Sequence, residues 1–184
     1  MTIRKAAIAA SAIIVVAAAT ELAMGRQFFC TCGSLDLWVG ARDSPKTSQM
    51  LADWYSLSHL VHGLIFYAAL WLLFRRWPIG QRFLAAVIVE ASWEVIENTP
   101  LVIDRYRETA AALGYNGDSI VNSISDILMM CIGFLAARKL PLWASLLLVV
   151  ILELIPLLVI RDNLTLNVWN LIAPSPTVAA WQAR

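Results

Sequence analysis

The chain has 184 residues, of which 60% are hydrophobic and 15% charged, and its formal net charge at pH 7 is +1. This composition is typical of an integral membrane protein and excludes an ordinary soluble domain. The near-zero charge, without a lysine- or arginine-rich stripe, argues against nucleic acid as a partner. Because no internal repeat or low-complexity linker divides the sequence, we expect a single membrane domain over residues 1–184.

Five stretches are long enough to cross about 30 Å of hydrocarbon at about 1.5 Å per residue. The sequence therefore predicts an all-α fold, an integral membrane bundle of five transmembrane helices. The first stretch is Ala-rich and follows Arg4 and Lys5, which also fits a cleaved signal peptide, although its length favours an uncleaved anchor. The predicted spans cover residues 5–24, 57–74, 83–103, 119–137 and 141–160.

The distribution of charge predicts the orientation of these spans, because short cytoplasmic segments retain Lys and Arg. The segments MTIRK, RRWPIGQR and RKL together hold seven of the fourteen basic residues and none of the thirteen acids. We therefore expect the N-terminus inside and the C-terminus outside.

Two segments on the predicted outer side are long. Residues 25–55 are long enough to fold as a cap over the outer face of the helices. They contain Cys30 and Cys32, for which we predict a structural role while their redox state stays open. The tail, residues 161–184, combines tryptophans with early prolines, so we expect it to lie along the interface rather than to form a sixth span.

Polar residues recur at one depth in the outer half of the predicted helices. The histidines are spaced i, i+3, the glutamates i, i+4, i+7, and three residues of the fourth helix i, i+4, i+8, so each set shares one helical face. An acidic residue near the bilayer centre costs roughly 2.5–3.5 kcal/mol, so these faces should turn inward around a polar pocket that opens toward the outer leaflet. The residues are His59, His62, Glu90, Glu94, Glu97, Asn98, Asp118, Asn122 and Asp126.

The pocket residues divide into predicted roles. Glu94, Glu97, His62 and Asp126 are the candidates for catalysis, and the same four could bind a divalent metal such as zinc or manganese. Glu90, the deepest acid, is expected to have a structural role, like the two cysteines. The candidates for substrate binding are Asn98, Arg105, Arg107, Asp118, Asn122 and His59, where the two arginines would hold a phosphate headgroup.

Two of these assignments have plain alternatives. A single polar residue such as Asn122 is more often a contact between helices than a functional group. Arg105 and Arg107 could equally anchor the chain at the interface. Glu153, near the outer end of the fifth span, is either a member of the site or the partner of an arginine at the outer rim.

Three functions fit this pattern. The first is an intramembrane site that binds or acts on a lipid-linked substrate. The second is a proton-coupled transporter, which needs polar residues across the whole bilayer. The third is a non-catalytic membrane subunit or assembly factor with an unidentified protein partner. Whether the chain is an enzyme stays open, because it contains no glycine-rich phosphate loop, no G-x-S-x-G and no H-E-x-x-H.

Five blocks of the sequence carry a resemblance to a known family. They are GRQFFCTCGSLDLW, DWYSLSHLVHG, EASWEVIENTPLVIDRYRE, GYNGDSIVNSISD and IRDNLTLNVWN. In this order they resemble the bacterial family called domain of unknown function 2585, also called uncharacterised protein family 0314. The resemblance covers nearly the whole chain and implies a multi-pass protein of the inner (cell) membrane of Gram-negative bacteria. It implies no activity.

Overall fold

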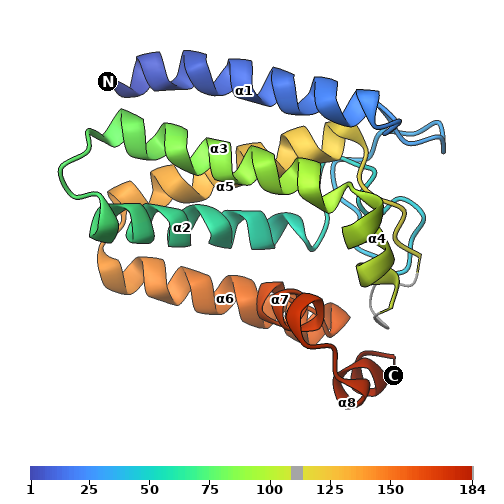
Figure 1. The fold of residues 1–184 in the computed structure, drawn as a ribbon. Helices are drawn as coiled ribbons and strands as arrows, with labels where there is room; N and C mark the ends of the chain where they lie inside the picture. The colour runs from blue at the N-terminus through green and yellow to red at the C-terminus, as the bar shows by residue number, and fades with distance from the viewer. Residues whose placement is uncertain (109–113, 184) are drawn as a thin grey trace.

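The computed structural model describes residues 1–108 and 114–183 and has an all-α fold in this part of the chain, as predicted. The longer helices lie alongside one another, and the short ones gather toward the end opposite the N-terminus (Figure 1). The helices are α1 (Ile3–Ala23), α2 (Ser56–Leu73), α3 (Ile79–Glu97), α4 (Pro100–Arg107), α5 (Ile120–Lys139), α6 (Leu142–Ile160), α7 (Leu164–Ile172) and α8 (Pro176–Gln182).

Four of these helices are long and apolar enough to cross a membrane, judged by length and composition: α1, α2, α5 and α6. Helix α3 has a similar length of 19 residues but contains Arg82 and the three glutamates, so its composition alone does not identify it as a span. Its place in a membrane therefore depends on what surrounds those glutamates.

The predicted stretch 83–103 differs from the helices that form there. Helix α3 begins earlier, at Ile79 after Pro78, and ends at Glu97. Thr99 has an extended backbone and Pro100 begins α4. A residue before proline is kept out of the helical region by the proline ring, so one continuous helix to residue 103 is excluded. Arg105 and Arg107 consequently lie on a separate short helix.

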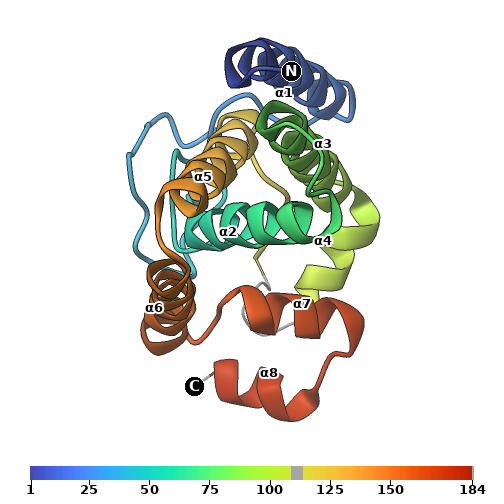
Figure 2. The ribbon, with the colours of Figure 1, turned by 90° about the vertical axis from the view of Figure 1, so that its left-hand side faces the viewer.

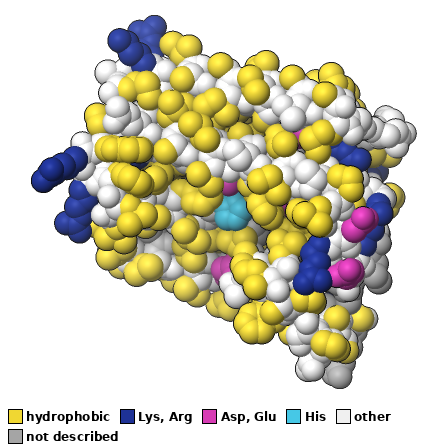
Figure 3. All heavy atoms as spheres, in the orientation of Figure 1, with side chains coloured by type: hydrophobic (Ala, Val, Ile, Leu, Met, Phe, Trp, Pro, Cys, Tyr) yellow, Lys and Arg dark blue, Asp and Glu magenta, His cyan; other side chains and the backbone are white. Residues whose placement is uncertain are grey.

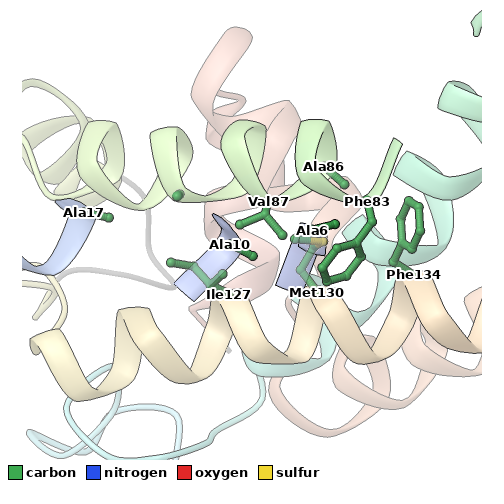
Figure 4. Close-up of a cluster of buried hydrophobic side chains, with 10 residues drawn as sticks. Ala6, Ala10, Ala17, Phe83, Ala86, Val87, Ile127, Met130 and Phe134 are labelled. Carbon is green, nitrogen blue, oxygen red and sulfur yellow. The ribbon is translucent and has the colours of Figure 1, made fainter. Parts of the chain in front are cut away.

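The helices pack through small residues. Helices α2 and α5 touch at Gly63 and Gly133, where an added Cβ would overlap the carbonyl oxygen of Met130 or of Leu60. Helix α1 packs its buried Ala6 and Ala10 against α3 as part of a buried apolar cluster (Figure 4). Such close contacts favour association in a membrane, where van der Waals packing is a main attraction between helices. The cluster contains Ala6, Ala10, Ala17, Phe83, Ala86, Val87, Ala91, Ile127, Met130 and Phe134.

The bundle has a layered arrangement (Figure 2). Helix α2 lies in the middle, with α1, α3 and α5 on one side and α6, α7 and α8 on the other. The basic segments 1–5, 74–82 and 138–141 meet at one end of the bundle, where lysine and arginine side chains are visible (Figure 3).

The segment 25–55 lies at the opposite end and is joined to the start of α5. Ile120 N donates to Gln27 O and Ser119 N donates to Ser48 O, with N···O distances of 2.9 and 3.0 Å. Within this segment Cys30 and Cys32 form a disulfide.

Candidate functional site

The two histidines of α2 meet the deepest glutamate of α3. Their i, i+3 spacing places both rings on the face of α2 that is turned toward α3. His59 Nδ1 lies 2.6 Å from Glu90 Oε1, and His62 Nδ1 lies 3.1 Å from each oxygen of the same carboxyl group. One ligand atom from each of these residues lies within 4.8 Å of the others, a spacing that could accommodate a metal ion.

A second group contains the other two glutamates of α3 and the aspartate that precedes α5. One carboxylate oxygen each of Glu94, Glu97 and Asp118 lies within 4.8 Å of the others. Asp118 Oδ2 accepts hydrogen bonds from Asn98 Nδ2 at 3.1 Å and from the Tyr115 hydroxyl at 2.9 Å. Burial raises the pKa of Asp118 to about 6. Asn98 Oδ1 also accepts from the Asp118 backbone N–H, so this asparagine orients the aspartate rather than standing free.

His59 connects the two groups. Its Nδ1 is 3.4 Å from Glu94 Oε1, and its Nε2 is 3.7 Å from Asp126 Oδ2 on α5. Both oxygens of Glu94, and Oδ1 of Asp126, are buried and have no hydrogen-bond partner among the described residues. Taking an ionised carboxylate out of water without a partner costs several kcal/mol. The oxygens of Glu94 and Oδ1 of Asp126 are therefore not satisfied by the described side chains of the cluster.

Two further buried acids lie near this cluster and were not predicted as site residues from the sequence. Glu21 is 1% exposed in the last turn of α1, close to Ser123 and Arg26. In the sequence, Glu21 could have been identified as a single acid near the end of an Ala-rich span. Asp53 is 3% exposed and accepts hydrogen bonds from the backbone N–H groups of Ser48 and Tyr55. These bonds show that Asp53 organises the turn before α2.

A cavity of about 1280 Å³ lies beside the cluster. It extends between α2, α3, α4 and α7 and the segment 25–55, and its basic lining residues are Arg26, Arg42 and Arg107. A histidine is visible in the middle of a largely hydrophobic face (Figure 3), and His62 has the more exposed of the two imidazole side chains, 17% against 9%. The apolar side chains of Phe66, Val89 and Trp93 also line the cavity.

The predicted substrate-binding residues lie in different places. His59, Asp118 and Arg107 line the cavity, and Arg107 donates to Tyr115 O and Asn116 Oδ1. Arg105 is not among the described lining residues, because its guanidinium donates to Leu171 O and to Glu108 and so ties α4 to α7.

Two polar residues of the sequence pattern have structural contacts. Asn122 Nδ2 donates to Met50 O at 3.0 Å, which joins α5 to the segment 25–55. Glu153 accepts from the backbone N–H groups of Leu164 and Thr165 and from the Thr165 hydroxyl. Carboxylates are stabilised at a helix N-terminus, so Glu153 caps α7 and lies outside the cluster.

Comparison with known proteins identifies relatives over most of the chain. The family model described as "Protein of unknown function (DUF2585)" matches residues 21–184. A UPF0314 protein of Paracoccus denitrificans is 48% identical over 93% of this chain and 89% of its own. A UPF0314 protein of Sphingopyxis alaskensis is 46% identical over 95% of this chain and 93% of its own. No solved structure matches the chain. Four candidate spans in a chain with bacterial relatives indicate a membrane location.

Proposed function

The chain belongs to the DUF2585 family of UPF0314 proteins, and from the chemistry of its buried cluster we propose that it acts on a lipid-linked substrate. In this proposal the protein crosses the bacterial inner membrane several times, with residues 25–55 as a cap over the outer face. The substrate enters the cavity from the outer leaflet, and Glu94, Glu97, His62 and Asp126 are the groups that act on it.

The observation that carries the proposal is that imidazole and carboxyl groups line a cavity beside a largely hydrophobic face of the molecule. A histidine is visible within the hydrophobic face (Figure 3), and His62, the more exposed of the two histidines, lines the cavity with Glu90, His59 and Asp126. A water-soluble substrate gains nothing from an entrance through hydrocarbon. A lipid can leave its chains among Phe66, Val89 and Trp93 while its headgroup reaches the carboxylates and imidazoles.

The arginines of the cavity favour an anionic headgroup. Arg26 Nε is buried and has no hydrogen-bond partner among the described residues, although Arg26 Nη1 donates to Asn116 O. Arg107 lines the same cavity beside Asn116. A guanidinium binds phosphate or carboxylate oxygens through paired N–H donors, so an anionic group could take the unused N–H of Arg26.

A proton-coupled transporter is the less favoured alternative. Transport needs a polar route from the cluster to the basic end of the bundle, but Phe83, Val87, Met130 and Phe134 are buried on that side. These side chains form an apolar layer across α3 and α5 (Figure 4). A pH-dependent flux in proteoliposomes would support transport in spite of this layer.

Lipid analysis of a deletion strain tests the proposal. Mass spectrometry of its lipid extract should show the accumulation of one lipid-linked species, which the wild-type gene removes and the His62→Ala and Glu94→Gln variants do not. Glu108→Gln is the matched control, because Glu108 is an exposed acid whose partner is Arg105. Unaltered lipid profiles, with a stoichiometric protein partner that only the two cluster variants lose, would instead favour a non-catalytic subunit.

A further inference from the structure

We propose that the cluster binds two divalent cations side by side, the first between His59, His62 and Glu90 and the second between Glu94, Glu97 and Asp118. This inference rests on the function proposed above, because it names the cofactor of the same site. It is carried by the geometry of two adjoining ligand groups and by the buried Glu94 oxygens, which have no hydrogen-bond partner in the described part of the chain.

The first position has the ligands of a transition metal. Both Nδ1 atoms face the Glu90 carboxyl group, at 2.6 Å for His59 and 3.1 Å for His62. Two imidazoles and one carboxylate suit zinc, manganese or iron in proteins. His62 is partly exposed toward the cavity, so a coordination position on that side would be open to a substrate.

The ring of His59 is oriented as that of a metal ligand would be. When Nδ1 binds the metal, the opposite nitrogen carries the proton and usually faces a carboxylate or a carbonyl group. His59 Nε2 faces Asp126 Oδ2 at 3.7 Å, and Asp126 lies on α5, across from α3. Asp126 would therefore select the tautomer of His59 rather than bind the ion itself.

The second position contains oxygen ligands only. Glu94 is 1% exposed, and neither of its oxygens has a hydrogen-bond partner among the described residues. Carboxylate groups of this kind suit magnesium or manganese. Asn98 Nδ2 and the Tyr115 hydroxyl both donate to Oδ2 of Asp118, which fixes the orientation of its carboxyl group.

Glu94 also places the two positions next to each other. Glu94 belongs to the second group, and its Oε1 lies 3.4 Å from Nδ1 of His59, a member of the first. A carboxylate between two ions is the usual bridge of two-metal sites, in which the ions are about 3.5–4 Å apart. Such a pair is suited to an anionic headgroup, because both ions can bind its oxygens.

Shared protons are the alternative way to offset the charge of this cluster. Glu94 Oε1 lies 3.4 Å from His59 Nδ1, but neither oxygen of Glu94 accepts a hydrogen bond from a described residue. A proton shared by two carboxyl groups offsets one negative charge, whereas a divalent cation offsets two. Of the five negative charges on Glu90, Glu94, Glu97, Asp118 and Asp126, two divalent cations would neutralise four, whereas both histidines, if protonated, would neutralise only two.

Manganese is the probe for both positions, since it accepts imidazole and carboxylate ligands alike. The full-length protein is purified in detergent, stripped with chelator and titrated with Mn²⁺ alone. We expect two equivalents per chain and an electron paramagnetic resonance spectrum typical of a coupled Mn²⁺ pair. His62→Ala and Glu97→Gln should each lower the stoichiometry from two to one and abolish the coupling, and Glu108→Gln should retain both ions.

Binding of fewer than two ions by the folded wild-type protein would overturn the proposal, and so would two equivalents in both cluster variants. The wild-type stoichiometry and spectrum remain decisive if a variant fails to fold. The lipid experiment separates the two proposals. Two bound ions without any effect on lipids would contradict the function alone, whereas lipid turnover by a metal-free protein would contradict the ion pair alone.

Discussion

At the scale of single residues, the carboxyl groups inside this fold are of two kinds. The buried Asp53 accepts hydrogen bonds from the backbone N–H groups of Ser48 and Tyr55, and the half-buried Glu153 accepts from those at the start of α7. Glu94 has no such partner among the described residues, and neither does Oδ1 of Asp126. The first kind stabilises local structure, whereas the second is a cost to stability unless something else binds there.

Glu94→Gln should therefore change stability in opposite directions with and without cations. In the presence of chelator the glutamine removes one negative charge from a crowded group, and we expect a gain of about 1–3 kcal/mol. In saturating Mn²⁺ the wild type should be the more stable protein, because its carboxylate binds the ion. Thermal unfolding in detergent under both conditions measures this, with Glu108→Gln as control. An unchanged order in the two conditions would contradict the metal site.

Asp162, which follows α6, predicts a pH dependence away from the cluster. Its carboxyl group accepts from the Tyr55 hydroxyl, Asn163 N and Gln182 Nε2, and Arg42 lies nearby. Burial is the largest cause that raises the pKa of Asp162, to about 6. Because the folded state holds this proton more tightly, its contribution to stability is fully present below the pKa of the unfolded chain and is lost as the pH rises through about 6.

Asp162→Asn should remove that dependence while it keeps the acceptor Oδ1. We expect the variant to lose less stability than the wild type between about pH 4 and pH 7, by on the order of 1–3 kcal/mol. Unfolding midpoints across this range measure the difference. Parallel profiles for the two proteins would show that Asp162 does not bind its proton more tightly in the folded state.

The acids and histidines of the cluster could be identified from the sequence, because an ionisable residue within an apolar span is costly. The sequence could not separate the two kinds of carboxyl group. Glu153 and Asp53 bind backbone N–H groups that become available only when the turns before α7 and α2 form. For the same reason the sequence could not decide whether Arg105 binds substrate or has a structural role, because its acceptor is the carbonyl oxygen of Leu171 on α7.

At the scale of helices, hydrophobicity predicted the ends of α1, α2, α5 and α6 within two residues, those of α3 less closely and the short helices poorly. The predicted span 141–160 agrees within one residue with the observed ends of α6, Leu142 and Ile160. Helices α4, α7 and α8 have only 8, 9 and 7 residues, too few for a hydrophobicity pattern to separate them from loops. The break at Thr99 depends on one proline, whose effect on the residue before it outweighs the apolar pattern.

The contact between α2 and α5 gives a prediction at this scale. Gly63→Ala and Gly133→Ala should each destabilise the protein by about 1–3 kcal/mol, because the new methyl group would force the two backbones apart. In an isolated helix the same change would stabilise by about 1 kcal/mol, so the sign of the effect tests the packing. Gly114→Ala is the control, since a Cβ there would meet no described atom within 4 Å. Equal unfolding midpoints for all three variants would contradict the close contact.

At the scale of the whole molecule, the number of crossings depends on α3. Composition supports four spans, and an even number would leave both termini on one side of the membrane. Helix α3 has 19 residues, which span about 28 Å, and it runs beside α1, α2 and α5 through the bundle (Figure 1). Glu90 and Glu94 are buried against the histidines of α2, so these acids do not prevent α3 from crossing the membrane.

We therefore predict five crossings, with the N-terminus inside and the C-terminus outside. The two termini lie at opposite ends of the bundle, and the basic segments 1–5, 74–82 and 138–141 share the end of the N-terminus (Figure 1). Cytoplasmic segments retain such basic residues. Alkaline phosphatase fused after residue 184 should be active and a fluorescent protein fused there dark, whereas fusions after residue 139 should behave in the opposite way. If the fusion after residue 184 reports the cytoplasm and the fusion after residue 139 reports the outside, α3 does not cross, and the cluster cannot open toward the outer leaflet.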